Sequence, residues 1–66
     1  MARRSRLDAV RKTFADATGS LEDAALAAAE AQAVSDFHSA RQSCDRLIEA
    51  VEACLGRLRR LRRRLE

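Results

Sequence analysis

The chain has 66 residues and a mass of 7.3 kDa, enough for one small domain that spans residues 1–66. Hydrophobic residues make up 47% and charged residues 35%, with two Gly and no Pro, Trp or Tyr, which favours long helices and argues against a β fold. Two Cys are too few for a disulfide framework, and no apolar run reaches the roughly 18–20 residues that a membrane span needs. Because no apolar stretch follows the basic N-terminus either, we expect a cytoplasmic helical protein.

The first predicted helix covers about residues 4–33. In a heptad frame that puts Leu7 at position a, every a and every d position is apolar. These are Leu7, Phe14, Leu21 and Ala28 at a, and Val10, Ala17, Ala24 and Ala31 at d. Gly19 falls at an outer f position, where the pattern runs through unshifted, although the segment 18–20 is an alternative place for the helix to end or bend.

A break in the helix is predicted near residues 34–37. Continuing the first register would place Ser35 at a and His38 at d, so the apolar stripe fails there. A new register begins at Phe37, two residues out of phase, which is a shift that coiled coils do not absorb. Ser35 and Asp36 offer side-chain oxygens that can cap the helix that follows.

The second predicted helix covers about residues 36–65, and its a and d positions are again all apolar. They are Phe37, Cys44, Val51, Leu58 and Leu65 at a, and Ala40, Leu47, Cys54 and Leu61 at d. Two helices of nearly equal length, each roughly 45 Å at about 1.5 Å per residue, predict an all-α antiparallel hairpin with coiled-coil-like packing. We expect the a and d side chains to lie between the helices, with Phe37 and Leu47 against Ala24, Ala28 and Ala31 of the first helix.

A lone two-helix hairpin has little core, because even a 60-residue globular domain buries only about 60% of its unfolded surface. Ile48 and Leu55, at e positions, widen the apolar stripe of the second helix toward the side that helical bundles use. The predicted partner-binding residues are therefore Ile48, Val51, Leu55 and Leu58. We expect a second copy of the chain, giving a homodimer, or another helical protein to cover them.

Charge is sorted along the chain. Five cations in residues 1–12 and six in residues 57–66 face only two carboxylates there, a formal +9, whereas residues 13–56 carry a formal −6. A hairpin brings the two ends together into a basic pole, which we define as Arg3, Arg4, Arg6, Arg59, Arg60, Arg63 and Arg64. Clustered guanidinium groups bind carboxylates and phosphates, which predicts an acidic protein surface or a nucleic acid as partner. The absence of aromatic residues from the basic stretch speaks against a membrane surface.

No catalytic, metal or cofactor site is predicted. Cys44 and Cys54 are ten residues apart on one helix, about 15 Å, and are expected to act as small core residues. His38 lies six residues from Cys44, which is not the i, i+4 spacing of two ligands on one helical face. Asp36, His38 and Ser39 are sequence neighbours and do not give triad geometry. We expect a non-enzymatic protein without a small-molecule substrate.

The pattern after the break, an aromatic residue followed by small and then branched residues (Phe37, Ala40, Cys44, Leu47, Val51), resembles the small co-chaperones of type III secretion needle subunits. That resemblance covers about residues 21–55 and implies a hairpin that stabilises a second chaperone; the arginine-rich tail is not part of it. The chain is also similar to the plasmid Rop proteins, RNA-binding four-helix bundles of two hairpins, in which Arg3 and Phe14 would lie on a first-helix face. We predict a protein-binding adaptor or co-chaperone, with a homodimeric nucleic-acid-binding regulator as the alternative.

Overall fold

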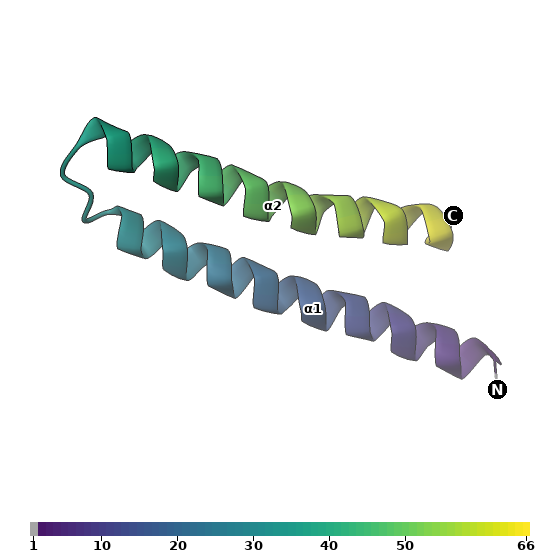
Figure 1. The fold of residues 1–66 in the computed structure, drawn as a ribbon. Helices are drawn as coiled ribbons and strands as arrows, with labels where there is room; N and C mark the ends of the chain where they lie inside the picture. Colours follow the sequence, from purple (N-terminus) through teal and green to yellow (C-terminus); the bar gives the residue numbers. More distant parts are fainter. Residues whose placement is uncertain (1) are drawn as a thin grey trace.

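Two antiparallel helices form the molecule. The computed structural model describes the backbone of residues 2–66 and the side chains from Arg6 onward, with α1 at Ala2–Ala31 and α2 at Phe37–Leu65. The helices pack along each other, and both termini lie at one end, which we call the open end; the other is the turn end (Figure 1). The predicted all-α antiparallel hairpin is confirmed. The first helix begins and ends two residues earlier than expected, and the second begins one residue later.

The end of α1 is made by tight backbone turns rather than by a glycine. Three successive amides donate to the carbonyl three residues back, at 3.1 to 3.2 Å: Gln32 to Ala29, Ala33 to Glu30 and Val34 to Ala31. Such bonds satisfy carbonyls that the helix end would leave without a partner. The chain then needs only residues 32–36 to reverse direction, so the break lies where the two heptad registers lose phase.

Asp36 begins α2. Its backbone is extended, with φ −141° and ψ 158°, which turns the chain out of the link and into the helix. Its carboxylate accepts a hydrogen bond from the backbone N–H of Ser39 at 2.7 Å and another from the Ser39 hydroxyl at 2.9 Å. One orphan amide of the first turn is thereby satisfied, as the sequence predicts for a helix N-cap at this position.

Helix α1 continues without interruption through Gly19, so the alternative break at residues 18–20 is wrong. The polar side chains around that point find partners within the helix. The hydroxyl of Thr13 donates to the carbonyl of Ala9 at 3.1 Å, and that of Thr18 donates to the carbonyl of Phe14 at 2.9 Å. These bonds let small polar residues occupy the helix without an unsatisfied hydroxyl.

The contact between the helices is narrow and built mainly from small side chains. Among the residues whose side chains the structure describes, only Ala17, Cys54 and Leu61 are buried, at 8%, 3% and 5% exposure. The covered and half-covered side chains of the contact recur at d and g positions along α1, and mainly at d positions along α2, where Ser43 at g and Leu58 at a are also half-covered. They are Val10, Thr13, Ala17, Ser20, Ala24, Ala27 and Ala31 in α1, and Ala40, Ser43, Leu47, Cys54, Leu58 and Leu61 in α2.

The expectation that the a positions also lie between the helices is wrong for every one of them except Leu58, which is half-covered. Phe37 is 95% exposed and does not pack on the alanines of α1, Cys44 and Ala28 are exposed, and Leu7, Phe14, Leu21, Val51 and Leu65 are 46 to 56% exposed. The helices are rotated so that their smaller d and g residues meet. Small residues let two backbones approach closely, whereas bulky a residues between them would hold the helices apart.

The molecule is a thin rod. It extends 55 × 18 × 10 Å with a radius of gyration of 15.8 Å, whereas about 11 Å is expected for a compact chain of this length. Its accessible surface is 5795 Å², compared with roughly 4,200 Å² for a compact monomer of this mass. The hairpin therefore exposes on the order of 1,600 Å² more surface than a compact protein would.

Candidate protein-binding surface

The a positions of both helices lie on the same side of the hairpin. Two antiparallel helices that meet through the same heptad positions are related by a two-fold axis perpendicular to the plane that contains them. This rotation exchanges the two helices, but a residue above the plane in one helix corresponds to a residue above the plane in the other. Since the d positions point between the helices in both, the a positions of α1 and α2, with the neighbouring e positions, face the same way.

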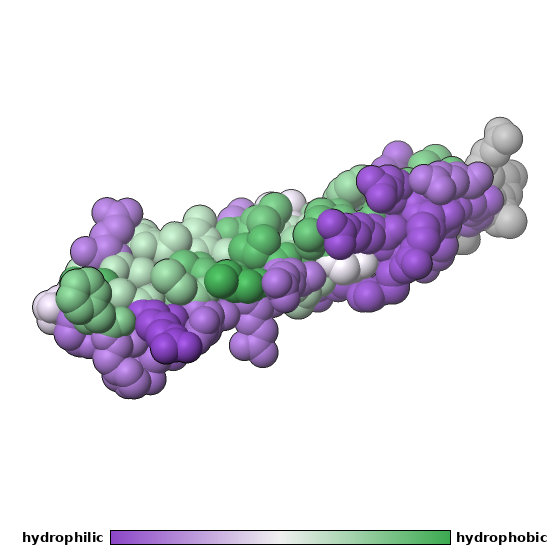
Figure 2. All heavy atoms as spheres, turned by 90° about the horizontal axis from the view of Figure 1, so that it is seen from above, coloured by the Kyte–Doolittle hydropathy of each residue, from purple (hydrophilic) through white to green (hydrophobic). Residues whose placement is uncertain are grey.

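Large apolar side chains gather on that side. We call them the apolar face, defined as Leu7, Phe14 and Leu21 of α1 with Phe37, Ile48, Val51, Leu55 and Leu65 of α2. Apart from Phe37, they are 40 to 56% exposed. Figure 2 shows hydrophobic residues continuing along the rod from the turn end, with hydrophilic residues gathered toward the open end. A connected apolar surface of this length marks a protein interaction site more often than a solvated one.

Three of the four predicted partner-binding residues, Ile48, Val51 and Leu55, lie on this face with 40 to 54% of their surface exposed. Leu58 is half-covered. The residues of α1 and Phe37 were missed, because the sequence interpretation placed them inside the hairpin. The signal was present in the sequence: small residues at the g positions of α1, Thr13, Ser20 and Ala27, mark a second stripe along which helices can approach.

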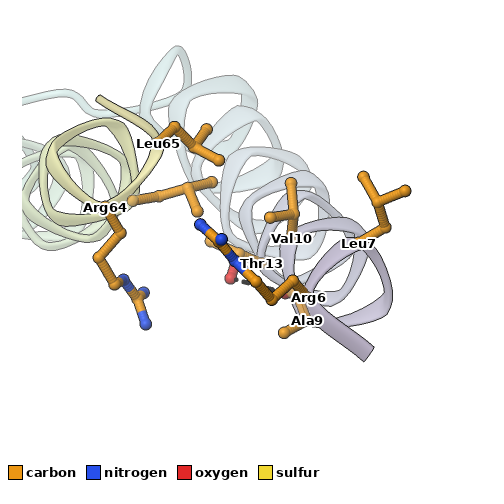
Figure 3. Close-up of a pocket in the computed structure, with 8 residues that line it drawn as sticks. Arg6, Leu7, Ala9, Val10, Thr13, Arg64 and Leu65 are labelled. Carbon is orange, nitrogen blue, oxygen red and sulfur yellow. Dashed lines mark hydrogen bonds between the residues drawn. The ribbon is translucent and has the colours of Figure 1, made fainter. Parts of the chain in front are cut away.

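A groove opens between the helices at the open end. It has a volume of about 700 Å³ and is lined by Arg6, Leu7, Ala9, Val10, Thr13, Leu61, Arg64 and Leu65; we call it the open-end groove. Figure 1 shows the helices diverging from the turn toward this end. In Figure 3, Leu7, Val10 and Leu65 lie toward one side of the groove, Arg6 reaches from α1 across its middle toward α2, and Arg64 extends toward the other side. The groove thus joins the apolar face to the cations of the open end.

The described arginines of the basic pole have no ion-pair partner within the hairpin. Arg59, Arg60, Arg63 and Arg64 are exposed on α2, and Arg6 on α1 lies at the same end, whereas the side chains of Arg3 and Arg4 fall outside the described residues. Among the side chains that the structure describes, the one ion pair joins Arg11 to Asp8 at 3.5 Å. Arg57 instead donates to the Ser20 hydroxyl across the helices at 2.7 Å.

The two halves of the rod differ in formal charge. Residues 19–50, the turn half, hold six carboxylates and two arginines, a net −4, and the remaining open half holds eleven cations and four carboxylates, a net +7. Because the described arginines of the pole have no carboxylate within ion-pairing distance, their charge is available to an acidic partner.

Near the turn, Asp36 and Ser39 form the N-terminal cap of α2. The pKa of Asp36 is lowered, first by the Ser39 backbone N–H and then by the Ser39 hydroxyl, which both donate to its carboxylate.

His38 is exposed, Cys44 is an exposed free thiol and Cys54 is a buried free thiol. Over the described residues, no three His, Cys, Asp or Glu side chains come together as metal ligands would, and neither helix is long and apolar enough to cross a bilayer.

Comparison with known proteins gives no match. No family model fits the chain, and no curated protein and no solved structure matches it. The resemblances to needle-subunit co-chaperones and to Rop proteins therefore stay predictions from the sequence, and the argument for function comes from the surface of the hairpin itself.

Proposed function

We propose that this hairpin is a non-enzymatic protein-binding module, an adaptor or co-chaperone, whose apolar face packs against an amphipathic helix with acidic flanks. The observation that carries the proposal is the row of eight large side chains, 40 to 95% exposed, on one side of both helices. Two adjacent helices with such a row offer a shallow channel in which a third helix can lay its apolar stripe. The uncompensated arginines beside it favour carboxylates on that partner.

The size of the exposed surface supports this function. A stable protein–protein interface buries about 800 Å² on each partner. The hairpin exposes on the order of 1,600 Å² beyond what a compact protein of its mass would, so an interface of ordinary size fits within that excess. Binding would also place Phe14, Ile48 and Val51 in the apolar environment that the hairpin alone does not provide.

The test compares one carboxylate placed on the apolar face with one placed away from it. Val51→Asp would bury an unpaired charge against the partner helix and should weaken binding by about 100-fold or more. Leu26→Asp is the matched control, because Leu26 is 61% exposed at an outer f position. The partner is captured from native cells with the wild-type chain, identified by mass spectrometry, and titrated with both variants by calorimetry. Equal affinities, with helicity preserved in circular dichroism, would contradict the proposal.

Nucleic-acid binding is a second candidate, favoured by the basic pole alone. The described arginines at the end of α2 have no carboxylate partner in the hairpin. Binding of this kind loses affinity steeply with salt, because each phosphate contact releases counterions. Reversing Arg59, Arg60, Arg63 and Arg64 to Glu should abolish binding of a duplex or hairpin RNA while leaving the helix content unchanged. RNA affinity that survives this reversal would exclude the pole as a nucleic-acid site.

A further inference from the structure

We propose that a second copy of this chain covers the apolar face, in an antiparallel arrangement in which Phe37 of each protomer enters the open-end groove of the other. This inference rests on the proposed function, since it uses the same face, and it names the occupant. Three observations carry it: the opposite placement of Phe37 and the groove on one face, the opposite charges of the two halves, and the area that the hairpin leaves uncovered.

Phe37 has no role within its own protomer. It is 95% exposed at the first position of α2, beside the turn, and contributes nothing to the contact between the helices. An exposed phenylalanine at an a position, on the same side as Val51 and Leu65, is placed as an anchor for another molecule. The surface that could receive it need only offer apolar walls and enough room for one aromatic ring.

The open-end groove offers both. Its walls include Val10, Leu61 and Leu65, its volume is about 700 Å³, and Leu7 and Leu65 also belong to the apolar face. Phe37 and the groove lie at opposite ends of a rod 55 Å long. Turning a second copy end for end against the apolar face therefore brings each Phe37 to the other's groove. Because the arrangement is two-fold symmetric, one complementary contact is made twice.

Charge selects this orientation over the alternative. With the rods antiparallel, each open half, a formal +7, lies beside the partner's turn half, a formal −4. Asp36 directly precedes Phe37, so in this arrangement it lies near the other protomer's arginines. Among them is Arg62, which occupies an e position beside the apolar face. A parallel pairing would instead place +7 against +7, and like charges across an interface oppose association.

The exposed surface of the hairpin is large enough for a dimer interface of ordinary size. A dimer of ordinary size covers about 800 Å² per partner, and each hairpin exposes on the order of 1,600 Å² more than a compact monomer of its mass. The paired hairpins form a four-helix bundle in which d and g positions pack within each protomer and a and e positions pack between protomers. Every apolar stripe of the sequence then has a partner.

Sedimentation equilibrium over a range of protein concentrations tests the proposal. The wild type should reach twice the chain mass of 7.3 kDa. Phe37→Ala should raise the dimer dissociation constant at least tenfold, and because Phe37 touches so little in its own protomer the variant keeps its hairpin. Leu26→Ala, which trims a large exposed residue on the outer side, is the matched control and should leave the constant unchanged. The dissociation constant of the wild type should also rise with added salt.

Cys44 provides a probe of the covered face without any substitution. It is an exposed free thiol at an a position, while Cys54 is buried within the hairpin. The rate at which a thiol reagent modifies Cys44 should fall as the protein concentration passes through the dimer dissociation constant, and Cys54 should stay protected throughout. For orientation, spin labels at position 66 of a Cys44→Ala, Glu66→Cys variant should lie apart by most of the 55 Å length of the rod.

Three results would overturn the proposal: a monomer at every concentration, spin labels close together at one end of the dimer, or a dimer dissociation constant that Phe37→Ala leaves unchanged. If the chain is monomeric yet captures a helical protein in a way that Val51→Asp abolishes, the second copy is excluded while the proposed function stands. If Val51→Asp changes neither dimer mass nor partner binding, both are excluded.

Discussion

At the residue scale, Asp36 shows how one side chain sets an element boundary. Its carboxylate is engaged twice by Ser39, and this lowers its pKa from the ordinary value of 3.8. A lowered pKa in the folded state means that the cap stabilises α2 at pH values above the ordinary pKa and loses this contribution as the pH falls through the folded-state value. Acid should therefore selectively loosen the first turn of α2.

The variant Asp36→Asn tests this coupling, because it keeps a cap of similar quality but removes the titrating group. Its stability relative to the wild type should rise as the pH is lowered from about 5 to about 2. Denaturant titrations followed by circular dichroism at several pH values measure the difference. Asp36→Ala should destabilise the helix at neutral pH, and parallel pH profiles for the wild type and Asp36→Asn would contradict the assignment of the cap.

Gly19 is a second residue whose effect is local. A Cβ built there would meet nothing within 4 Å, and the backbone is already helical. Gly19→Ala should stabilise the protein by about 1 kcal/mol, because glycine loses more backbone freedom in a helix than alanine does. The melting temperature should rise by about 4–8 °C. Gly19→Pro should do the opposite, and a lower melting temperature for the alanine variant would contradict a continuous helix through this position.

At the scale of the elements, the sequence predicts the helices well and their mutual rotation poorly. The phase jump at Phe37 locates the link, and Asp36 supplies the cap. A heptad that is apolar at a and d, however, does not reveal which side of the stripe faces the neighbouring helix. Rotation depends on side-chain size: Thr13, Ser20 and the alanines of α1 permit close contact, and bonding the Thr13 hydroxyl to Ala9 removes the penalty for covering it.

Leu61 and Leu65 give a direct test of that rotation. Leu61 is 5% exposed between the helices, and Leu65, one turn later, is 56% exposed on the apolar face. At concentrations that keep the chain monomeric, Leu61→Ala should cost about 2–5 kcal/mol of unfolding free energy. Leu65→Ala should cost much less, since little of its surface is removed from water. Chemical denaturation measures the unfolding free energy of the two variants. Equal decreases would support the original prediction that both a and d residues pack between the helices.

At the scale of the whole molecule, the narrow contact and the segregated charge have a common consequence. Among the residues whose side chains are described, the hairpin buries three and leaves ten large apolar ones exposed, eight of them on the apolar face, so its own core is a small source of stability. The open half, at a formal +7, also repels itself, in keeping with the divergence of the helices toward that end. A partner along the rod that is apolar and oppositely charged would cover the exposed apolar side chains and reduce the repulsion within the open half.

Thermal unfolding should therefore depend on protein concentration. If folding and pairing of two copies are coupled, a tenfold increase in concentration adds about 1.4 kcal/mol to the stability of each dimer, and the melting temperature rises by a few degrees. Phe37→Ala should lose this dependence over the range where the wild type shows it, while Leu26→Ala retains it. Added salt should reduce the concentration dependence, since it screens attraction between the basic and acidic halves. A melting temperature that is the same across all concentrations, for the wild type as for Phe37→Ala, would mean that the narrow contact between α1 and α2 suffices to hold the hairpin.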